Sequence, residues 1–253
     1  MKFHIVLLSI LLALGSSNCV AQEKKFTFGP KVGFMFGAPI PHGKNESIDS
    51  TKGTPLIGPN IGVFFLYQFA PKWSLWVEGN YNRKALEYSA KATNLPYLEE
   101  ICVDLPNGTR VCGTDPSLIF NGTTWGSFDN WYFEIPVLIR YSLNDKWHLF
   151  AGPYYASLNK SSSKVFYNGF AGASTIPLQD ERDLSDNMSK HDYGVNLGFH
   201  YQYKPILVDF RMSYGFASIF NEEYKPIDYP VRNAYAQLSV AFQFRYKNEP
   251  DPK

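Results

Sequence analysis

Apolar and polar residues alternate with a period of two along much of the chain, most clearly in residues 191–216. Tyr193 and Val195 begin a series of apolar residues separated by glycine and polar residues, which Lys204 and Pro205 interrupt before it resumes. Successive side chains of a strand point to opposite faces of a sheet, so this period predicts two strands joined by a short turn. One face of this predicted hairpin is apolar and aromatic, and the other is small, polar and charged.

The same alternation recurs along the rest of the chain and predicts eight strands in all. Besides the two strands within 191–216, the predicted strands cover residues 26–36, 60–69, 73–84, 131–141, 147–158 and 234–246. Short turns are expected at 70–72, 142–146 and 204–205, whereas 39–54, 85–129, 159–190 and 217–232 are long polar connections. In an up-and-down meander this places every long loop at one end, which is typical of outer-membrane barrels.

The apolar faces of the predicted strands carry no charge through their middles, and aromatic residues gather toward the strand ends, as in the aromatic girdles of membrane barrels. We therefore predict an all-β fold, an eight-stranded antiparallel up-and-down transmembrane β-barrel with long extracellular loops and short periplasmic turns. A lipocalin-like soluble barrel is the alternative, with the apolar face turned inward around a ligand. The loop asymmetry and the aromatic girdles argue against it.

The first residues predict export. Residues 1–21 combine Lys2, an apolar run at 5–14 and small residues before Gln22, which is the pattern of a secretory signal peptide. The apolar run is too short to span a bilayer as a helix. A lipoprotein signal at Cys19 is the alternative, but Asn18 fits that processing site poorly. Residues 22–253 are then expected to form one outer-membrane barrel domain with a flexible tail at about 247–253.

Composition narrows the list of partners. The chain is 17% aromatic and has a net charge of +1, so it offers no broad basic field for nucleic acid. Cys102 and Cys112 are the two cysteines beyond the predicted signal peptide, and they flank a Pro-Asn-Gly turn. In an exported protein this spacing predicts a disulfide across a small hairpin. A metal site is the weaker alternative, because no second Cys or His pair accompanies them.

An eight-stranded barrel leaves a lumen only wide enough for side chains to fill. Ionisable residues on the polar strand faces are expected inside it: Lys31, Glu78, Glu134, Arg140, His148, Asp192, His200, Asp209, Arg211 and Arg245. Buried charges must pair, so we predict a network of three acids with three arginines. Its members are Glu78, Glu134, Asp209, Arg140, Arg211 and Arg245. This network is expected to plug the barrel, and a gated channel or proton path is the alternative.

Catalytic residues are sparse. His148, His191 and His200 are the candidate bases on or beside the predicted strands. His191, with Ser189 nearby, lies where lipid chemistry at the outer rim would occur, yet no G-x-S-x-G nucleophile motif is present. We expect a rim histidine on a solvated loop end, no enzyme and no cofactor. A lipid-modifying hydrolase or acyltransferase that uses His191 is the alternative.

Several strand sequences resemble the PorT-like outer-membrane β-barrel family. They include FEIPVLIRY at 133–141, AGPYYASL at 151–158, DYGVNLGFHYQY at 192–203, VDFRMSYGF at 208–216, GPKVGFMFG at 29–37 and VEGNYNRKA at 77–85. The resemblance covers the strands in order and none of the long loops, and it implies a small bacterial outer-membrane barrel. The family's namesake is associated with the secretion system that exports gingipain-type proteases and gliding adhesins, but most relatives have no assigned role. The family offers no catalytic motif, and the segment with Cys102 and Cys112 is not one of its features.

The expected function is therefore that of a non-enzymatic barrel in the outer membrane of a Gram-negative bacterium. It would act through its long extracellular loops or its wall, in protein binding or as an accessory of secretion or surface assembly. The expected partners are outer-membrane lipid and a secretion-system or surface protein.

Overall fold

The computed structural model describes residues 26–42, 46–96, 100–104, 110–114, 119–172, 177–222, 224, 227 and 229–246. The predicted signal peptide 1–21 and the predicted tail 247–253 lie outside the described residues. Within this part of the chain, secondary structure is almost entirely β. The short 3-10 helix η1 (Ser185–Asn187) is far from the length that a membrane crossing needs, and no described helix is long and apolar enough for one.

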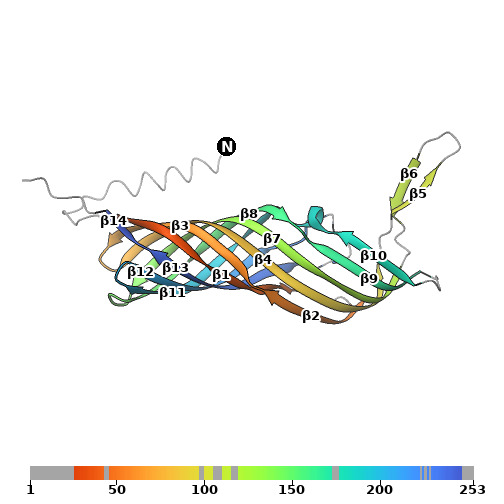
Figure 1. The fold of residues 1–253 in the computed structure, drawn as a ribbon, viewed down its shortest axis with the longest axis horizontal. Helices are drawn as coiled ribbons and strands as arrows, with labels where there is room; N and C mark the ends of the chain where they lie inside the picture. The colour runs from red at the N-terminus through yellow and green to blue at the C-terminus, as the bar shows by residue number, and fades with distance from the viewer. Residues whose placement is uncertain are drawn as a thin grey trace, which may run out of the picture.

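Eight antiparallel strands in the described part of the chain close into a ring, as the sequence predicts (Figure 1). The last of these strands pairs with the first, and the strand order is otherwise that of a meander. The ring consists of β1 (Phe26–Pro41), β3 (Gly58–Ala70), β4 (Trp73–Pro96), β7 (Ile119–Ser142), β8 (Trp147–Ser161), β11 (His191–Tyr203), β12 (Ile206–Ser218) and β13 (Val231–Phe242). The short strand β14 (Phe244–Tyr246) resumes after Gln243 and pairs with the start of β1.

The barrel wall is apolar outside and polar inside. Large apolar side chains of the spanning strands are exposed, among them Leu197 at 64% and Met212 at 61%. The alternate residues face the lumen and are buried, including Lys31 and Arg211 at 2% and 0%. This arrangement suits a wall surrounded by lipid, since a soluble barrel would place its apolar residues inside. The outward direction of the aromatic face predicted for residues 191–216 is thus confirmed.

The two longest strands continue well beyond the membrane-spanning wall, which corrects the prediction that 85–129 is a polar connection. β4 continues to Pro96, and β7 already begins at Ile119, so the two strands pair far outside the bilayer. β2 (Ile48–Leu56) pairs with the extension of β4, and β9 (Lys164–Ala171) with the extension of β7. β10 (Leu178–Asp183) pairs with β9, so the predicted connection 159–190 also contains strands.

We call these five paired segments, β2, β4 from residue 85, β7 up to residue 127, β9 and β10, the extracellular sheet. It lies at the end of the barrel opposite the short turns, as Figure 1 shows. Thr, Ser and Asn are common in the strands of the extracellular sheet. Because the solvated outer face of these strands is polar, the sequence shows no clear alternation of apolar and polar residues there. The strands form because the inner face has a core of its own.

The core of the extracellular sheet is built from aromatic and aliphatic side chains on its inner face and on the segments that fold under it. Met188 and Phe220 form an isolated bridge there, and burial raises the pKa of the nearby Tyr224 hydroxyl well above its ordinary value. The buried members are Ala92, Leu95, Phe120, Val165, Tyr167, Leu184, Met188, Ile219, Phe220 and Val231. The extracellular end is therefore a folded platform and not a set of open loops.

A second, smaller sheet consists of β5 (Glu100–Asp104) and β6 (Arg110–Thr114). This hairpin stands apart from the wall and projects from the extracellular end (Figure 1). Its register places Cys102 directly opposite Cys112. The side chains of both cysteines lie outside the described residues, so the disulfide stays a prediction.

Candidate functional site

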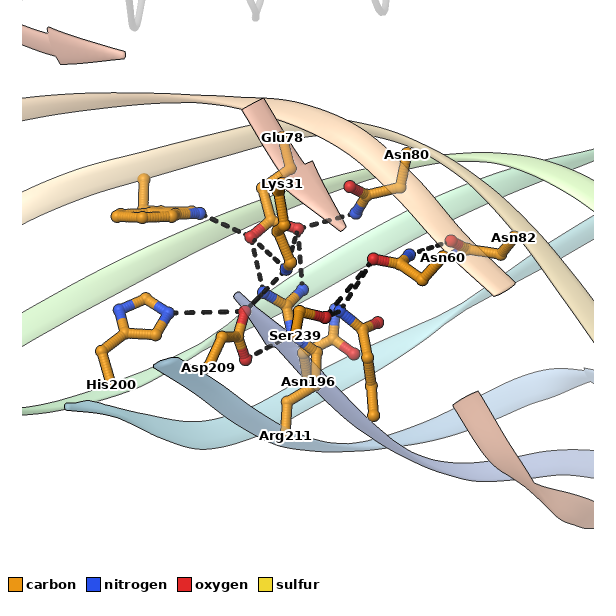
Figure 2. Close-up of polar contacts among 12 residues, drawn as sticks. Lys31, Asn60, Glu78, Asn80, Asn82, Asn196, His200, Asp209, Arg211 and Ser239 are labelled. Atoms are coloured by element: carbon orange, nitrogen blue, oxygen red, sulfur yellow. Dashed lines mark hydrogen bonds and ion pairs between the residues drawn. The ribbon is translucent and has the colours of Figure 1, made fainter. Parts of the chain in front are cut away.

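The most elaborate chemistry among the described residues lies in the lumen, where four charged side chains meet (Figure 2). Lys31 Nζ lies 2.8 Å from Glu78 Oε1 and 2.6 Å from Asp209 Oδ2. Arg211 donates to both oxygens of Glu78, at 2.5 and 3.0 Å, and also to Asp209. All four side chains are inaccessible to solvent. We call these four residues the inner cluster.

Strand register brings the inner cluster together. Asp209 and Arg211 are two residues apart on β12 and so point to the same side. Glu78 comes from β4, four strands from β12 around the ring, and Lys31 comes from β1, two strands from β12. The cluster is neutral because two cations pair with two carboxylates. Arg211 binds Glu78 in a bidentate manner, which is the strongest type of ion pair.

Neighbouring polar groups complete the hydrogen bonds of Glu78. Trp76 Nε1 donates to Oε1 at 2.6 Å, and Asn80 Nδ2 donates to Oε2 at 2.7 Å. His200 Nε2 lies 3.6 Å from Asp209 Oδ2. The His200 ring is held between Trp76 and Phe150, with ring centroids 4.5 and 4.4 Å away. The cluster is thus anchored to aromatic side chains on the periplasmic side.

A second ion cluster lies nearer the extracellular end and consists of Lys84, Glu134 and Asp192. Lys84 Nζ lies 2.9 Å from Asp192 and 3.4 Å from Glu134. Asp192 also accepts hydrogen bonds from Asn233 at 2.8 Å and Tyr154 at 3.2 Å. The amino group of Lys84 faces three tyrosine rings at 5.0–5.7 Å from their centroids, those of Tyr132, Tyr154 and Tyr235. We call this group the outer cluster.

Uncharged polar side chains fill the space between the two clusters. Asn60 donates to Asn82, and Gln237 donates to Asn60 at 3.3 Å and to Ser239 at 2.8 Å. On the adjacent strands β12 and β11, Ser213 donates to Asn196 at 2.5 Å. On the periplasmic side an apolar layer closes the barrel, with Phe64 stacked on Trp76 at 4.2 Å. The other members of that layer are Leu66, Leu138, Phe150, Leu207 and Ala241.

The structure corrects the predicted single network. Glu78, Asp209 and Arg211 come together as predicted, but Glu134 belongs to the outer cluster. Arg140 pairs with no carboxylate among the described residues. It donates to Gln202 at 3.3 Å and lies over the Trp76 ring. The side chain of Arg245 lies outside the described residues.

The reason for the error is depth along the barrel. Register places Arg140 opposite Ser74, four residues before Glu78 on β4. Four residues of strand correspond to about 13 Å, which is too far for a direct ion pair. The second cation of the inner cluster, beside Arg211, is Lys31 and not one of the other two predicted arginines. Lys84 was missed, although it continues the lumen-facing even-numbered series of β4 that includes Glu78.

The rim residues considered for catalysis do not form a nucleophile and base pair. His191 Nδ1 lies 2.6 Å from the Tyr155 hydroxyl on the exposed outer wall. The Ser189 hydroxyl donates to the backbone carbonyl of His191 at 3.0 Å, and not to its ring. His148 Nδ1 lies 2.9 Å from the Ser142 hydroxyl at the periplasmic end. Each candidate histidine therefore has a structural neighbour, and the three lie at different places in the barrel.

Similarity to known proteins agrees with this architecture. Residues 20–221 match the family described as outer membrane protein beta-barrel domain. No curated protein matches the chain.

Among solved structures, the chain is similar to Ail, the attachment invasion locus protein of Yersinia pestis, in complex with the heparin analogue sucrose octasulfate. The two share 12% identity with a TM-score of 0.39, over 87% of this chain and 99% of that one. The outer membrane protein OprG of Pseudomonas aeruginosa shares 13% identity with a TM-score of 0.38, over 87% and 97% of the chains. The outer membrane protease OmpT of Escherichia coli shares 8% identity with a TM-score of 0.34, over 91% and 99%.

The family match spans most of the chain, and the inside-out wall carries the features of a membrane barrel. The chain belongs to the outer membrane protein β-barrel domain family and is an eight-stranded barrel of the bacterial outer membrane.

Proposed function

We propose that this protein is a non-enzymatic scaffold that binds a protein partner at its extracellular end, as an accessory of secretion or surface assembly. The observation that carries the proposal is the folded extracellular platform with its own buried core. Long segments that hold a fixed structure on a rigid barrel are the usual carriers of function. The hairpin β5–β6 extends from this platform into the space where a partner would approach (Figure 1).

The lumen supports the same proposal by what fills it. Two ion clusters, a layer of amides and hydroxyls and an apolar layer succeed one another along the barrel. Buried charges that are paired and hydrogen-bonded act as a core, and a transport path would have to break them. A lumen filled in this way offers no transport path, so the extracellular surface is the part of the barrel at which a partner would bind.

The resemblance of the strand sequences to the PorT-like family supports a role beside a secretion system. That resemblance rests on strand motifs such as FEIPVLIRY at 133–141, which lie within the barrel wall. The family's namesake is associated with a protein secretion system, and a non-enzymatic barrel with a structured outer end suits a role beside such a system.

The test is to remove the hairpin without disturbing the barrel. β4 and β7 are still in register at Pro96 and Ile119, so residues 97–118 can be replaced by Asn-Gly, which favours a tight hairpin turn. Photocrosslinking from residue 222, which is exposed at the extracellular end between β12 and β13, should capture a specific protein in the wild type in native outer membrane. The replacement should abolish that product. The matched control carries the crosslinker at residue 144 in a periplasmic turn.

Two outcomes would contradict the proposal. One is a wild-type crosslinking pattern that is the same from the extracellular and periplasmic positions. The other is a replacement variant that folds as a heat-modifiable barrel and retains both the crosslinked product and the phenotype of the intact strain.

A further inference from the structure

No described segment covers the outer face of the extracellular sheet, whereas its inner face is covered by the platform core. On the outer face of β7 and β9, Trp125 and Phe170 are 41% and 44% exposed, although both lie beyond the membrane-spanning part of the wall. Large exposed aromatic side chains on a rigid sheet outside the lipid belt need an explanation, because apolar patches usually mark a binding surface.

Register arranges this face in rows across the sheet. Trp125 on β7 lies opposite Phe166 on β9 and Ser89 on β4. The rings of Trp125 and Phe166 are stacked, with centroids 5.9 Å apart and planes 12° apart. The next row outward holds Thr123 opposite Asn168, and neither side chain is hydrogen-bonded to a described residue. The face therefore offers a flat aromatic pair beside free hydroxyl and amide groups.

The charges of the face nearly balance. Three lysines and four carboxylates lie on or beside its rows: Lys52, Lys91, Lys164, Asp49, Glu87, Glu181 and Asp183. Lys164 and Glu181 already pair with each other at 2.5 Å. A strongly charged partner would gain nothing from such a surface, and a lipid chain would leave its polar groups without hydrogen bonds.

A saccharide matches this chemistry. The face of an aromatic ring carries negative partial charge and attracts the C–H groups of a sugar ring, while the sugar hydroxyls hydrogen-bond to amides and hydroxyls. Stacked aromatic rings with polar side chains at the next row supply both kinds of contact on one plane.

The height of this face above the membrane indicates which saccharide it would meet. Arg83 and Asp129 form an ion pair at 2.8 Å on the outer wall, directly above the exposed apolar belt that includes Phe133. Trp125 lies four residues farther out on the same strand, about 13 Å from that pair. Since β4 and β7 cross the membrane themselves, this height faces the sugar layer of the outer leaflet in which the barrel stands. We propose that the outer face of the extracellular sheet binds the oligosaccharide of the outer-leaflet glycolipid, with Trp125 and Phe166 as its stacking platform.

The test uses the full mature barrel in detergent micelles and the oligosaccharide released from the outer-membrane glycolipid of the bacterium that makes it. Calorimetric titration should detect binding to the wild type. Trp125→Ala should weaken that binding by about tenfold or more, because a stacking contact is lost. Asn168→Ala should weaken it less. Trp147→Ala is the matched control, since Trp147 is 43% exposed at the periplasmic end of β8 and should bind as the wild type does.

Heat-modifiable migration identifies the variants that remain folded, so a loss of binding in a folded Trp125→Ala barrel is specific. The proposal is overturned if the wild type does not bind the oligosaccharide, or if Trp125→Ala binds it as well as the wild type. It is also overturned if the barrel binds only capsular polysaccharide, or if Trp125→Ala instead abolishes self-association. The titration contains no protein partner, so its outcome is independent of the scaffold function proposed above.

Discussion

Lys31, Glu78, Asp209 and Arg211 form a neutral group with no access to water. An isolated buried ion costs several kcal/mol, and each member of the group is tolerated because the others compensate it. Trp76 and Asn80 add hydrogen bonds to Glu78, so its carboxylate has more partners than a surface ion pair provides. The group therefore acts as a structural lock that ties β1 and β4 to β12 across the lumen.

Replacing Glu78 by Gln should destabilise the barrel. The substitution keeps the shape of the side chain but leaves Lys31 and Arg211 with one carboxylate, so the free energy of unfolding should fall by about 3–5 kcal/mol. Urea unfolding of the barrel in lipid vesicles, followed by tryptophan fluorescence, measures it. Glu87→Gln, on the exposed face of the same strand, is the control and should change the free energy by less than about 0.5 kcal/mol. Equal effects of the two variants would contradict the structural lock.

His191→Ala should leave the lipid A of the outer membrane unchanged. The His191 ring contacts the Tyr155 hydroxyl, and the Ser189 hydroxyl donates to the backbone carbonyl of His191, so among the described residues this ring is not hydrogen-bonded to the neighbouring serine. Mass spectrometry of lipid A from the variant, the intact strain and a strain without the protein measures the outcome. A variant profile that departs from the intact strain and matches the strain without the protein would revive the enzymatic alternative.

At the scale of elements, the membrane-spanning strands followed from the sequence, and the extracellular sheet did not. In lipid, one face of each strand must be apolar. The period of two is therefore clear in β11, in β12 and in the membrane-spanning part of β7. Outside the lipid the exposed face is polar, and the buried face is shared with distant segments near Phe220. A single strand there carries too weak a pattern to be recognised.

The hairpin β5–β6 should contain a disulfide. Cys102 and Cys112 are directly opposite in the register, and opposed residues of an antiparallel pair have Cα atoms about 4.5–5.5 Å apart, within the range that a disulfide bridges. Intact mass after alkylation, with and without reductant, should show two thiols only in the reduced protein. Reduction should leave the barrel heat-modifiable, since the hairpin stands apart from it. Two alkylated thiols without reductant would contradict the pairing.

At the scale of the whole molecule, sequence reasoning could assign residues to the lumen but not pair them. Whether a side chain faces the lumen or the lipid follows from the alternation of residues along its strand. For this reason Glu78, Asp209 and Arg211 were correctly expected in the lumen. Pairing needs depth, and depth depends on strand tilt and register, which the sequence does not show. Arg140 and Glu78 share a face yet lie at different levels, and Lys84 reaches Asp192 only because β4 and β11 bring them to one level.

The successive lumen layers make the barrel a closed support for its extracellular platform. The apolar layer around Trp76 and Phe64 lies on the periplasmic side, the ion clusters lie in the middle, and the platform core lies at the outer end. Each layer is stabilised by its own contacts, so removal of the hairpin β5–β6 should not open the lumen. This arrangement supports the proposal that the extracellular platform carries the function.

The most direct test of a closed, ion-paired lumen is single-channel recording of the purified barrel in planar lipid bilayers. We expect no conductance steps for the wild type, and none for the variant in which residues 97–118 are replaced by Asn-Gly, because the inner cluster and the apolar layer remain in place. Steady, reproducible conductance through the wild-type barrel would contradict the account.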